Sequence, residues 1–326
     1  MNKIRQNMRK IQIIICLLLT SLLAKGQHRA NYTDKRNYTA EKTYLDATSQ
    51  IGSSARIIND VTYTDGFGRK WQEIQVGGSP SGNSDLVLPY EYSSIGQVEK
   101  EYLPYTKEGN NGAFDANMLV PSHWSIYGTE EQNYAFTHTQ YENSPLARVV
   151  QQTGPGKAWH TNGKGTNIDY DMNHSEEVRL YKVSSNGVLS VGGYYQSGTL
   201  QKQIVTDEDG HKSEIFTDNN DKTILTIAVD GNEKMETYYV YDARNQLRYV
   251  LPPEATHQLG MSIDISVLEK LAYYYEYDRK GRMTVKRLPG CQLISMVYDR
   301  CDRLILSQNG KQCTENTAKW SYFIYD

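Results

Sequence analysis

Short runs of alternating hydrophobic and polar residues recur along this chain, and a cluster of turn-forming residues interrupts each of them. Residues 273–290, YYYEYDRKGRMTVKRLPG, show the pattern most clearly. In an extended strand, Tyr273, Tyr275 and Tyr277 fall on one face and the residues between them on the other. After the break DRKG the alternation resumes, which indicates a second strand. This stretch therefore predicts a β-hairpin.

The break between the two runs has the chemistry of a tight turn. Asp278 and Gly281 occupy the first and fourth positions, which favour Asp and Gly in a type I turn, because glycine accepts the left-handed backbone conformation that closes the loop. The same spacing occurs at Asp65 and Gly68, Ser93 and Gly96, Ser184 and Gly187, Asp207 and Gly210, Asp242 and Asn245, and Asp299 and Asp302. We expect these positions to be structural.

Repetition of the hairpin predicts the fold class. An isolated hairpin is marginally stable in water. We therefore expect the hairpins to line up edge to edge, each burying the tyrosine face of the last. The predicted fold is mainly β, with tandem hairpins forming an extended or shell-like antiparallel sheet.

One segment departs from the β pattern. Residues 253–272 place Pro253 in a first helical turn and Gly260 at a helix end. Ser266 and Glu269 have the spacing of a capping box. The segment predicts one or two short helices.

The N-terminus carries the features of a secretory signal peptide. Four basic residues precede an apolar run of 14 residues, and small residues before Gly26 offer a cleavage site, so residues 1–26 form the predicted signal. The alternative, a membrane anchor, is disfavoured because the run is short for a bilayer span. Cys16 lies inside the run, which argues against a lipoprotein anchor. We expect a secreted or cell-surface protein without a membrane span in the mature chain.

Charge and tyrosine content narrow the class of protein. Removal of the signal takes away five of the 35 basic residues and none of the 38 acidic ones, which leaves a net charge near −8. That balance argues against a nucleic-acid partner, which usually requires a basic face. The chain has 26 Tyr against 5 Phe, a bias that favours sheet with a broad wet surface over a thick apolar core.

A loop rich in glycine marks the predicted domain boundary. Residues 154–165, GPGKAWHTNGKG, separate an N-terminal β domain at 27–160 from a hairpin region at 161–326. The loop has no Walker frame, so no nucleotide site is expected there.

Three cysteines remain after removal of the signal. Cys291, Cys301 and Cys313 form an odd set, which in an exported protein implies at least one free thiol or an intermolecular bond. A disulfide between two of them is the alternative. Their spacings differ from those of zinc-binding CxxC motifs.

No residue set has the spacing of a known catalytic motif. His138, His160 and His174 stand outside any HExxH or GxSxG frame. Asp169 and Asp171 share a strand face and could in principle carry out acid–base chemistry on a sugar, but solvated acidic faces are far commoner. We expect no catalytic residue and no cofactor.

Two further sets have both a functional and a structural interpretation. TDEDG at 206–210 and TDNNDK at 217–222 resemble calcium loops, but turn chemistry explains the same residues, and we expect no metal ligand. The four tryptophans could stack on sugar rings or pack between hairpins, and packing is the favoured interpretation. They are Trp71, Trp124, Trp159 and Trp320.

The tyrosine–aspartate pairs give the chain a family resemblance. Tyr241, Tyr277, Tyr298 and Tyr325 each precede an aspartate, and YEYDRKGRMTVKRL is the best copy. These residues resemble the YD-repeat, or RHS-repeat, family of large exported bacterial proteins. The upstream half, with VTYTDGFGRKWQEIQV and SPLARVVQQTGPGKAW, is similar to the domain of unknown function that opens many such proteins.

The resemblance implies a non-enzymatic scaffold. In full-length relatives the repeats form a hollow shell that can enclose a C-terminal effector, so downstream repeats or an effector domain are the implied partners. A surface adhesin module that binds cell-surface carbohydrate is the alternative, and a β-rich glycan hydrolase is a third. The sequence ends at Asp326 on the first position of a turn. We therefore expect the repeat region to be incomplete there, and residues 319–326 to fray or to pair with a partner.

Overall fold

A computed structural model describes residues 13–15, 36–45, 57–80, 82–231, 233–314 and 319–325. Of the predicted signal peptide, 1–26, only the strand β1 (Ile13–Ile15) is described, and it pairs antiparallel with β2 (Asn37–Tyr44). Among the described residues, no helix is long and apolar enough to cross a bilayer.

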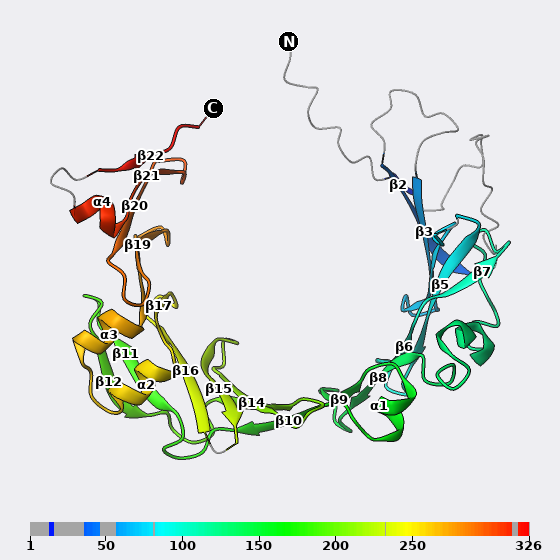
Figure 1. Cartoon of the computed structure of the whole chain (residues 1–326), viewed down its shortest axis with the longest axis horizontal. Helices are drawn as coiled ribbons and strands as arrows, with labels where there is room; N and C mark the ends of the chain where they lie inside the picture. The colour runs from blue at the N-terminus through cyan, green and yellow to red at the C-terminus, as the bar shows by residue number, and fades with distance from the viewer. Residues whose placement is uncertain are drawn as a thin grey trace, which may run out of the picture. The chain divides into compact units, whose positions relative to one another are not determined.

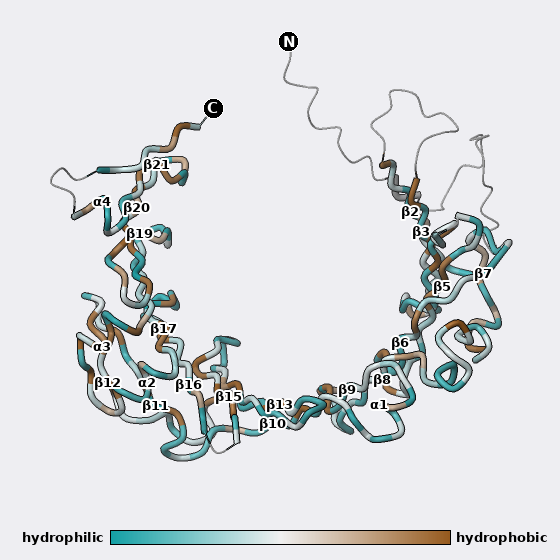
Figure 2. Tube along the Cα trace, in the orientation of Figure 1, coloured by the Kyte–Doolittle hydropathy of each residue, from teal (hydrophilic) through white to brown (hydrophobic). Residues whose placement is uncertain are grey.

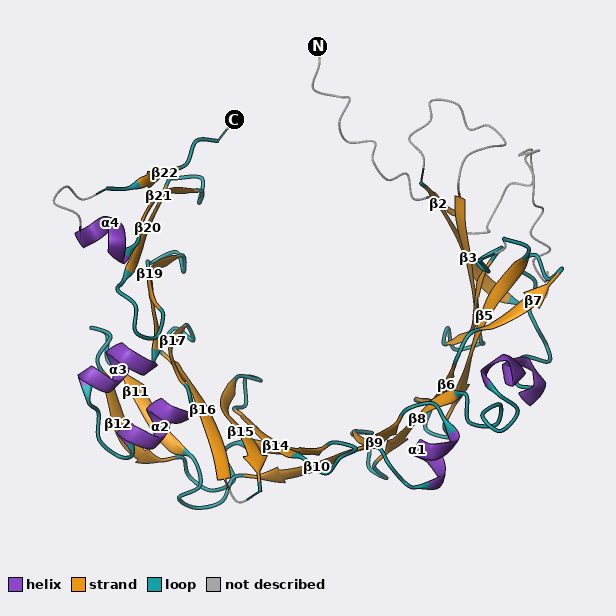
Figure 3. Ribbon diagram, viewed as in Figure 1, coloured by secondary structure: helices purple, strands orange, loops and turns teal. Residues whose placement is uncertain are grey.

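The chain folds as two compact units, residues 1–166 and 167–326. Strands dominate both units and helices are few and short (Figure 3). Every pairing between strands is antiparallel within the described part of each unit, and most join consecutive strands. The predicted fold class, mainly β and built from tandem hairpins, is confirmed.

The first unit is a meander whose long central strand carries two branches. Its further elements are β3 (Ile57–Thr64), β4 (Lys70–Gln75), β5 (Ser84–Tyr92), β6 (Val98–Tyr102), β7 (Tyr105–Glu108), η1 (Pro121–Tyr127), β8 (Phe136–Tyr141), β9 (Val149–Thr153) and α1 (Lys157–Thr161). The first half of β5 pairs with β7 and its second half with β6, which in turn pairs with β8. The sequence predicted neither η1 nor α1.

Aromatic side chains fill much of the core of the first unit. Tyr63, Tyr105 and Trp124 are buried with Val61 and Ile74. The Tyr102 ring stacks on Trp124, and the Trp124 indole N–H donates to the Leu103 carbonyl at 2.7 Å. Tyrosine therefore builds the core as well as the wet surface that its abundance suggested.

A buried polar group ties the loop before η1 to this core. Asp115 accepts a hydrogen bond of 2.6 Å from the Tyr105 hydroxyl and pairs with Lys107 Nζ at 2.6 Å. Its backbone N–H donates to the Gln72 side chain at 2.8 Å. Each strong polar atom of the carboxylate thus has a partner, as burial requires.

The second unit continues as a longer meander with one detached hairpin. Its strands are β10 (Thr166–Met172), β11 (Arg179–Val183), β12 (Leu189–Tyr194), β13 (Gln201–Thr206), β14 (Lys212–Thr217), β15 (Thr223–Asp230), β16 (Glu233–Tyr241), β17 (Leu247–Leu251), β18 (Tyr273–Tyr277), β19 (Met283–Arg287), β20 (Ile294–Tyr298), β21 (Leu304–Gln308) and β22 (Ser321–Tyr322). β11 and β12 pair with each other in a sheet of their own.

Two helices and the detached hairpin cover the sheet of the second unit (Figure 1). α2 (Pro253–Leu259) packs against β16, and its buried residues join a core that includes Phe216, Leu225 and Leu251. Arg179 of β11 donates to the Thr256 and Gly260 carbonyls, each at 3.0 Å, and thereby fastens the hairpin to the end of α2.

The predicted helices are present, but one predicted cap is wrong. α2 and α3 (Ile265–Leu271) lie in the expected segment, with Pro253 in the first turn and Gly260 at the end of α2. The Ser266–Glu269 capping box does not form. Asp264 is the N-cap instead, because its carboxylate accepts the Ser266 N–H at 2.8 Å. A further short helix, α4 (Gly310–Thr314), was not predicted.

The strand faces also differ from the expectation. Tyr273, Tyr275 and Tyr277 are only half-buried, whereas Tyr274 on the opposite face is buried against Tyr249, with ring centroids 4.8 Å apart. Figure 2 shows hydrophobic and hydrophilic positions interspersed along the trace, but alternation in the sequence does not say which face other elements will cover. α2 and α3 cover the face that includes Tyr274, and they determine which face becomes the core.

Candidate functional site

The hairpin tips carry the most regular chemistry of the described chain. At the tip between β18 and β19, the Asp278 carboxylate accepts the backbone N–H groups of Lys280 and Arg282 at 2.8 and 3.0 Å. The Gly281 N–H donates to the Asp278 carbonyl at 3.1 Å, and Gly281 has a φ of 82°. This is a type I turn closed by a left-handed residue.

The other predicted tips have the same backbone geometry. The fourth residue has a positive φ at Gly68, Gly96, Gly187, Gly210, Asn245 and Asp302. A side-chain oxygen of the first residue accepts the N–H of the fifth at Asp65, Ser93, Ser184, Asp207, Asp242 and Asp299. These residues therefore satisfy the turn's own backbone donors, which is a structural role.

An arginine after the turn links one hairpin to the next. Arg282 pairs with Asp278, Nε to Oδ2, at 2.7 Å. Its Nη1 donates to the Asp299 carbonyl of the following tip at 2.9 Å, and its guanidinium carbon lies 5.0 Å from the centre of the Tyr298 ring. A second contact, to Asp302, is 2.7 Å long. One side chain thus connects two tips by an ion pair, hydrogen bonds and a cation–π contact.

The same contact set recurs elsewhere in each unit. Arg303 pairs with Asp299 at 2.8 Å and lies 5.2 Å from the ring of Tyr325. In the first unit, Arg69 pairs with Asp65 at 2.7 Å and lies 4.6 Å from the ring of Tyr92. We call this recurring set the tip bridge. It consists of the turn aspartate, the arginine four residues later, and the tyrosine before the next turn.

Tyrosine hydroxyls lock the bridged tips together. Tyr92 donates to the Lys70 carbonyl at 2.6 Å and Tyr325 to the Leu304 carbonyl at 2.7 Å. In both cases the acceptor lies five residues after the first residue of the preceding turn. Tyr241 has a weaker version, in which Lys222 Nζ lies 5.6 Å from its ring. Tyr277 is half-buried, and burial raises the pKa of its hydroxyl although the positive charge of Arg248 opposes this shift.

The electrostatics of the tips follow from these contacts. The pKa of Asp299 is lowered because the Arg303 backbone N–H and guanidinium donate to the carboxylate, although partial desolvation opposes them. The pKa of Asp207 is lowered by hydrogen bonds from His211, whose own pKa is raised by the same contact. Such carboxylates stay charged at neutral pH and hold their cationic partners.

Sequence reasoning missed several hairpins, among them β8–β9, β14–β15 and β15–β16, and the whole set of bridges. Asp218 accepts the Asn220 and Lys222 N–H groups, and Asp221 has a φ of 57° at the fourth position. Residues 217–222, one of the two segments that resembled calcium loops, therefore form a further hairpin tip. The signal for the bridges was an arginine directly after the fourth turn residue, at positions 69, 282 and 303.

Each of the three histidines of interest contacts an acidic side chain or a carbonyl, and the rings of His138 and His160 lie with their centres 6.4 Å apart. His138 lies 3.5 Å from Glu99 and His174 3.5 Å from Asp171, as ion-pair contacts. The His160 ring contacts the Phe136 carbonyl at 3.1 Å. Within the described ranges, no group of three or more His, Cys, Asp or Glu residues has an arrangement that could hold a metal ion.

The acidic pair and the tryptophans have mixed surroundings. Asp169 stands opposite Ile204 in the β10–β13 pairing and Asp171 opposite Lys202. Trp124 is a core residue, in agreement with the packing interpretation. Trp71, Trp159 and Trp320 keep 36, 40 and 42% of their surface exposed.

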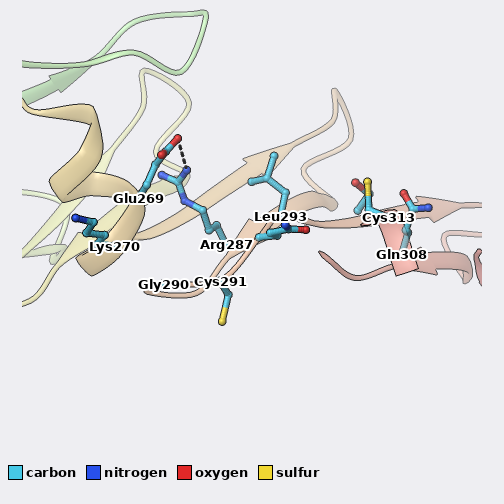
Figure 4. A pocket seen from close by; sticks show the side chains of 10 residues that line it. Glu269, Lys270, Arg287, Gly290, Cys291, Leu293, Gln308 and Cys313 are labelled. Carbon is cyan, nitrogen blue, oxygen red and sulfur yellow. Dashed lines mark ion pairs between the residues drawn. The ribbon is translucent and has the colours of Figure 1, made fainter. Parts of the chain in front are cut away.

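Three thiols lie on the surface of the second unit. Cys291, Cys301 and Cys313 are exposed and free, so the alternative of a disulfide between two of them is wrong. Two of them line a cavity of about 590 Å³ (Figure 4). In that view Cys291 and Cys313 come from different segments, and Arg287 points toward Glu269, 3.6 Å away.

Comparisons with known proteins identify one domain. Residues 34–172, which include β2 through β10, match a family model described as a domain of unknown function (DUF6443). This match agrees with the expected similarity of the upstream half to a domain of unknown function. No curated protein matches the chain.

Solved structures that align with this chain include the crystal structures of TcdB2-TccC3 and of TcdB2-TccC3-Cdc42. Each aligns with 83% of this chain at 15% identity and a TM-score of 0.49. This chain spans 12% of the length of either one.

Proposed function

We propose that the chain is a non-enzymatic, exported β scaffold and the front part of a protein of the RHS/YD-repeat family. The tip bridge is the observation that carries this proposal. It repeats at Asp65, Asp278 and Asp299, and each time the aspartate, arginine and tyrosine hold neighbouring hairpins together. Side chains occupied in this way support a building unit rather than a reaction.

The bridge gives such a scaffold a means of extension. Each turn aspartate accepts hydrogen bonds from the backbone N–H groups of its own turn. The arginine after the turn contacts the ring of the next tyrosine, as Arg282 does with Tyr298. The strand β22 pairs with β21 on one side, Ser307 opposite Ser321, and Tyr325 occupies the position next to Arg303. Downstream hairpins, or an effector domain that they enclose, are the partners that we propose. Asp326 itself lies outside the described residues.

Hydrogen exchange tests the bridging role. Arg282→Gln should speed amide exchange in β20, because the variant loses the contacts to Asp278, the Asp299 carbonyl and Tyr298. Arg279→Gln is the matched control, since it removes the same charge from an exposed position of the same turn. Equal exchange in both variants would mean that the bridge does not couple hairpins, and the scaffold proposal would lose its support.

Export rests on residues 1–26 and has a separate test. Fused to a phosphatase that is active only outside the cytoplasm, the segment should direct export, and the exported chain should begin at Gln27. Replacing Leu18 and Leu19 with arginine should abolish export, because a charged core cannot serve as the apolar run. Export that survives this replacement would refute the assignment.

A second candidate function is a carbohydrate- or cell-binding surface module. Exposed aromatic rings around a cavity at the first hairpin tip favour it. Phe67 is 86% exposed there and Trp71 36% exposed. Binding of the intact chain to immobilised glycans is the test, and absence of binding would leave the scaffold role alone.

A further inference from the structure

The tip of the β3–β4 hairpin borders a cavity of about 470 Å³ in the first unit. Its walls combine aromatic rings with charged groups. The main contributors are Asp65, Phe67, Arg69, Trp71, Glu91 and Tyr92. A volume in this range is typical of small-molecule sites, which pair an apolar lining with a few fixed polar groups.

The aromatic rings are held in place without being buried. Phe67 occupies the third position of the turn, and its backbone N–H donates to Asp65 at 2.8 Å. The turn therefore fixes the backbone of Phe67, and the guanidinium carbon of Arg69 lies 5.2 Å from the centre of a ring that is 86% exposed. Trp71 is held by Arg36, 5.0 Å from its ring centre, and by Phe114 at 5.4 Å. Rings that stay exposed to water forgo part of the free energy that burial would contribute, so their position calls for an explanation.

The polar groups are rigid and retain unused capacity. The Arg69 Nε and Nη2 atoms both pair with Asp65 Oδ2 at 2.7 Å, which leaves the Nη1 donors free of that pair. The two Glu91 oxygens accept from Lys100 and from the Tyr102 hydroxyl, one bond each, and each oxygen can accept another. Donors and acceptors thus stand beside the rings in a preorganised form.

We propose that this cavity binds a sugar ring. The proposal rests on the second candidate function and gives that function a location. The apolar C–H face of a pyranose would lie against Phe67 and Trp71, and its hydroxyls, which both donate and accept, match Arg69 and Glu91. An apolar peptide side chain would leave the charged groups unused. A simple anion would be attracted by Arg69 but repelled by Asp65 and Glu91.

The test is an array of plant, animal and bacterial surface glycans probed with the intact chain. We expect at least one glycan to bind, and Phe67→Ala and Trp71→Ala to weaken it about tenfold or more. Ile95→Ala is the matched control, because Ile95 is the exposed third residue of the next turn and does not line the cavity. Circular dichroism confirms that each variant is folded, and Phe67→Ala, at a highly exposed position, keeps the test valid if Trp71→Ala unfolds.

Each outcome has a definite meaning. Glycan binding that Phe67→Ala and Ile95→Ala leave equally intact would overturn this site but keep a surface-binding function elsewhere. No glycan bound, or capture of apolar peptides only, would overturn both the site and the second candidate function. Neither result affects the scaffold proposal, because that proposal depends on hydrogen exchange at Arg282.

Discussion

Replacing Gly187 with alanine should loosen the contact between the β11–β12 hairpin and the main sheet of the second unit. Gly187 has a φ of 80°, and its carbonyl accepts the Tyr249 hydroxyl at 2.8 Å. A Cβ at this position would lie 2.6 Å from the Tyr274 hydroxyl and 3.0 Å from Arg248 Nη2. The substitution therefore adds a steric clash to the backbone strain.

The magnitude follows from separating the two effects. The left-handed conformation alone costs an alanine about 1 kcal/mol. Displacing Tyr274, which is buried and lies beside Tyr249, should cost about 1–3 kcal/mol more, the usual range for overpacking. Gly210→Ala isolates the first effect, because Gly210 has the same turn position and a φ of 89° but no atom within 4 Å of its Cβ site.

The assay is urea unfolding followed by circular dichroism, with hydrogen exchange of β12 and β18 as the local measure. In a Tyr274→Phe background the closest contact disappears, because the next atom of that ring, Cζ, lies 3.7 Å from the Cβ site. The remaining close atom, Arg248 Nη2 at 3.0 Å, is the far end of a flexible side chain that can move aside. There Gly187→Ala should cost no more than Gly210→Ala. The reasoning would be refuted if Gly187→Ala still destabilised the protein more than Gly210→Ala in the Tyr274→Phe background. It would also be refuted if the two substitutions destabilised the wild-type protein equally.

Three further predictions concern charged groups. Lys202→Met should destabilise the second unit by at most about 3 kcal/mol, because the half-buried Glu177 and Glu214, at 2.7 and 3.0 Å from Lys202, lose their counter-ion. Exposed Lys212→Met is the control in urea unfolding, and an equal loss in both variants would contradict this prediction. Hydrogen bonds from Arg148 and Ser144 lower the pKa of Glu142 to about 2, so the stability that this ion pair contributes is present above the ordinary carboxyl pKa and is lost as pH falls toward 2. A carbon-detected NMR titration should show this midpoint, and Arg148→Ala should raise it; an unchanged midpoint would contradict the pairing. A hydrogen bond to Asp207 raises the pKa of His211. The stability that this ion pair contributes is therefore present below the ordinary histidine pKa and is lost as pH rises through the raised value. Asp207→Asn should lower the pKa of His211 in a proton NMR titration, and an unchanged pKa would contradict the pairing.

The hairpins could be predicted from the sequence because their information is local. Asp278 and Gly281 suffice to specify a turn, whatever lies around them. At Asp218 turn chemistry was expected but a hairpin tip was not. An aspartate, Asp221, takes the left-handed position there, as Asp302 does at the predicted tip that starts at Asp299. The Ser266 cap was wrong because Asp264 stands two residues earlier and competes for the same backbone donor.

The tip bridges and the sugar cavity were beyond prediction for a different reason. The contact of Arg282 with Tyr298 depends on how closely one hairpin lies against the next, and alternation carries no such distance. Likewise, Trp71 was weighed as a packing residue on its own. Its partial exposure depends on Arg36 and Phe114, which are remote in the sequence.

The tip bridge has a consequence for how the second unit gains and loses its structure. Because Arg282 contacts its own tip and the tip that follows, and Arg303 contacts its own tip and Tyr325, each link joins neighbouring segments. Stability in such an array behaves as a one-dimensional sum of unit and interface terms. Unfolding should then start at an end of the hairpin array and proceed to the next hairpin only after the preceding one is lost. Folding can proceed vectorially, since each completed hairpin offers its successor a prepared arginine.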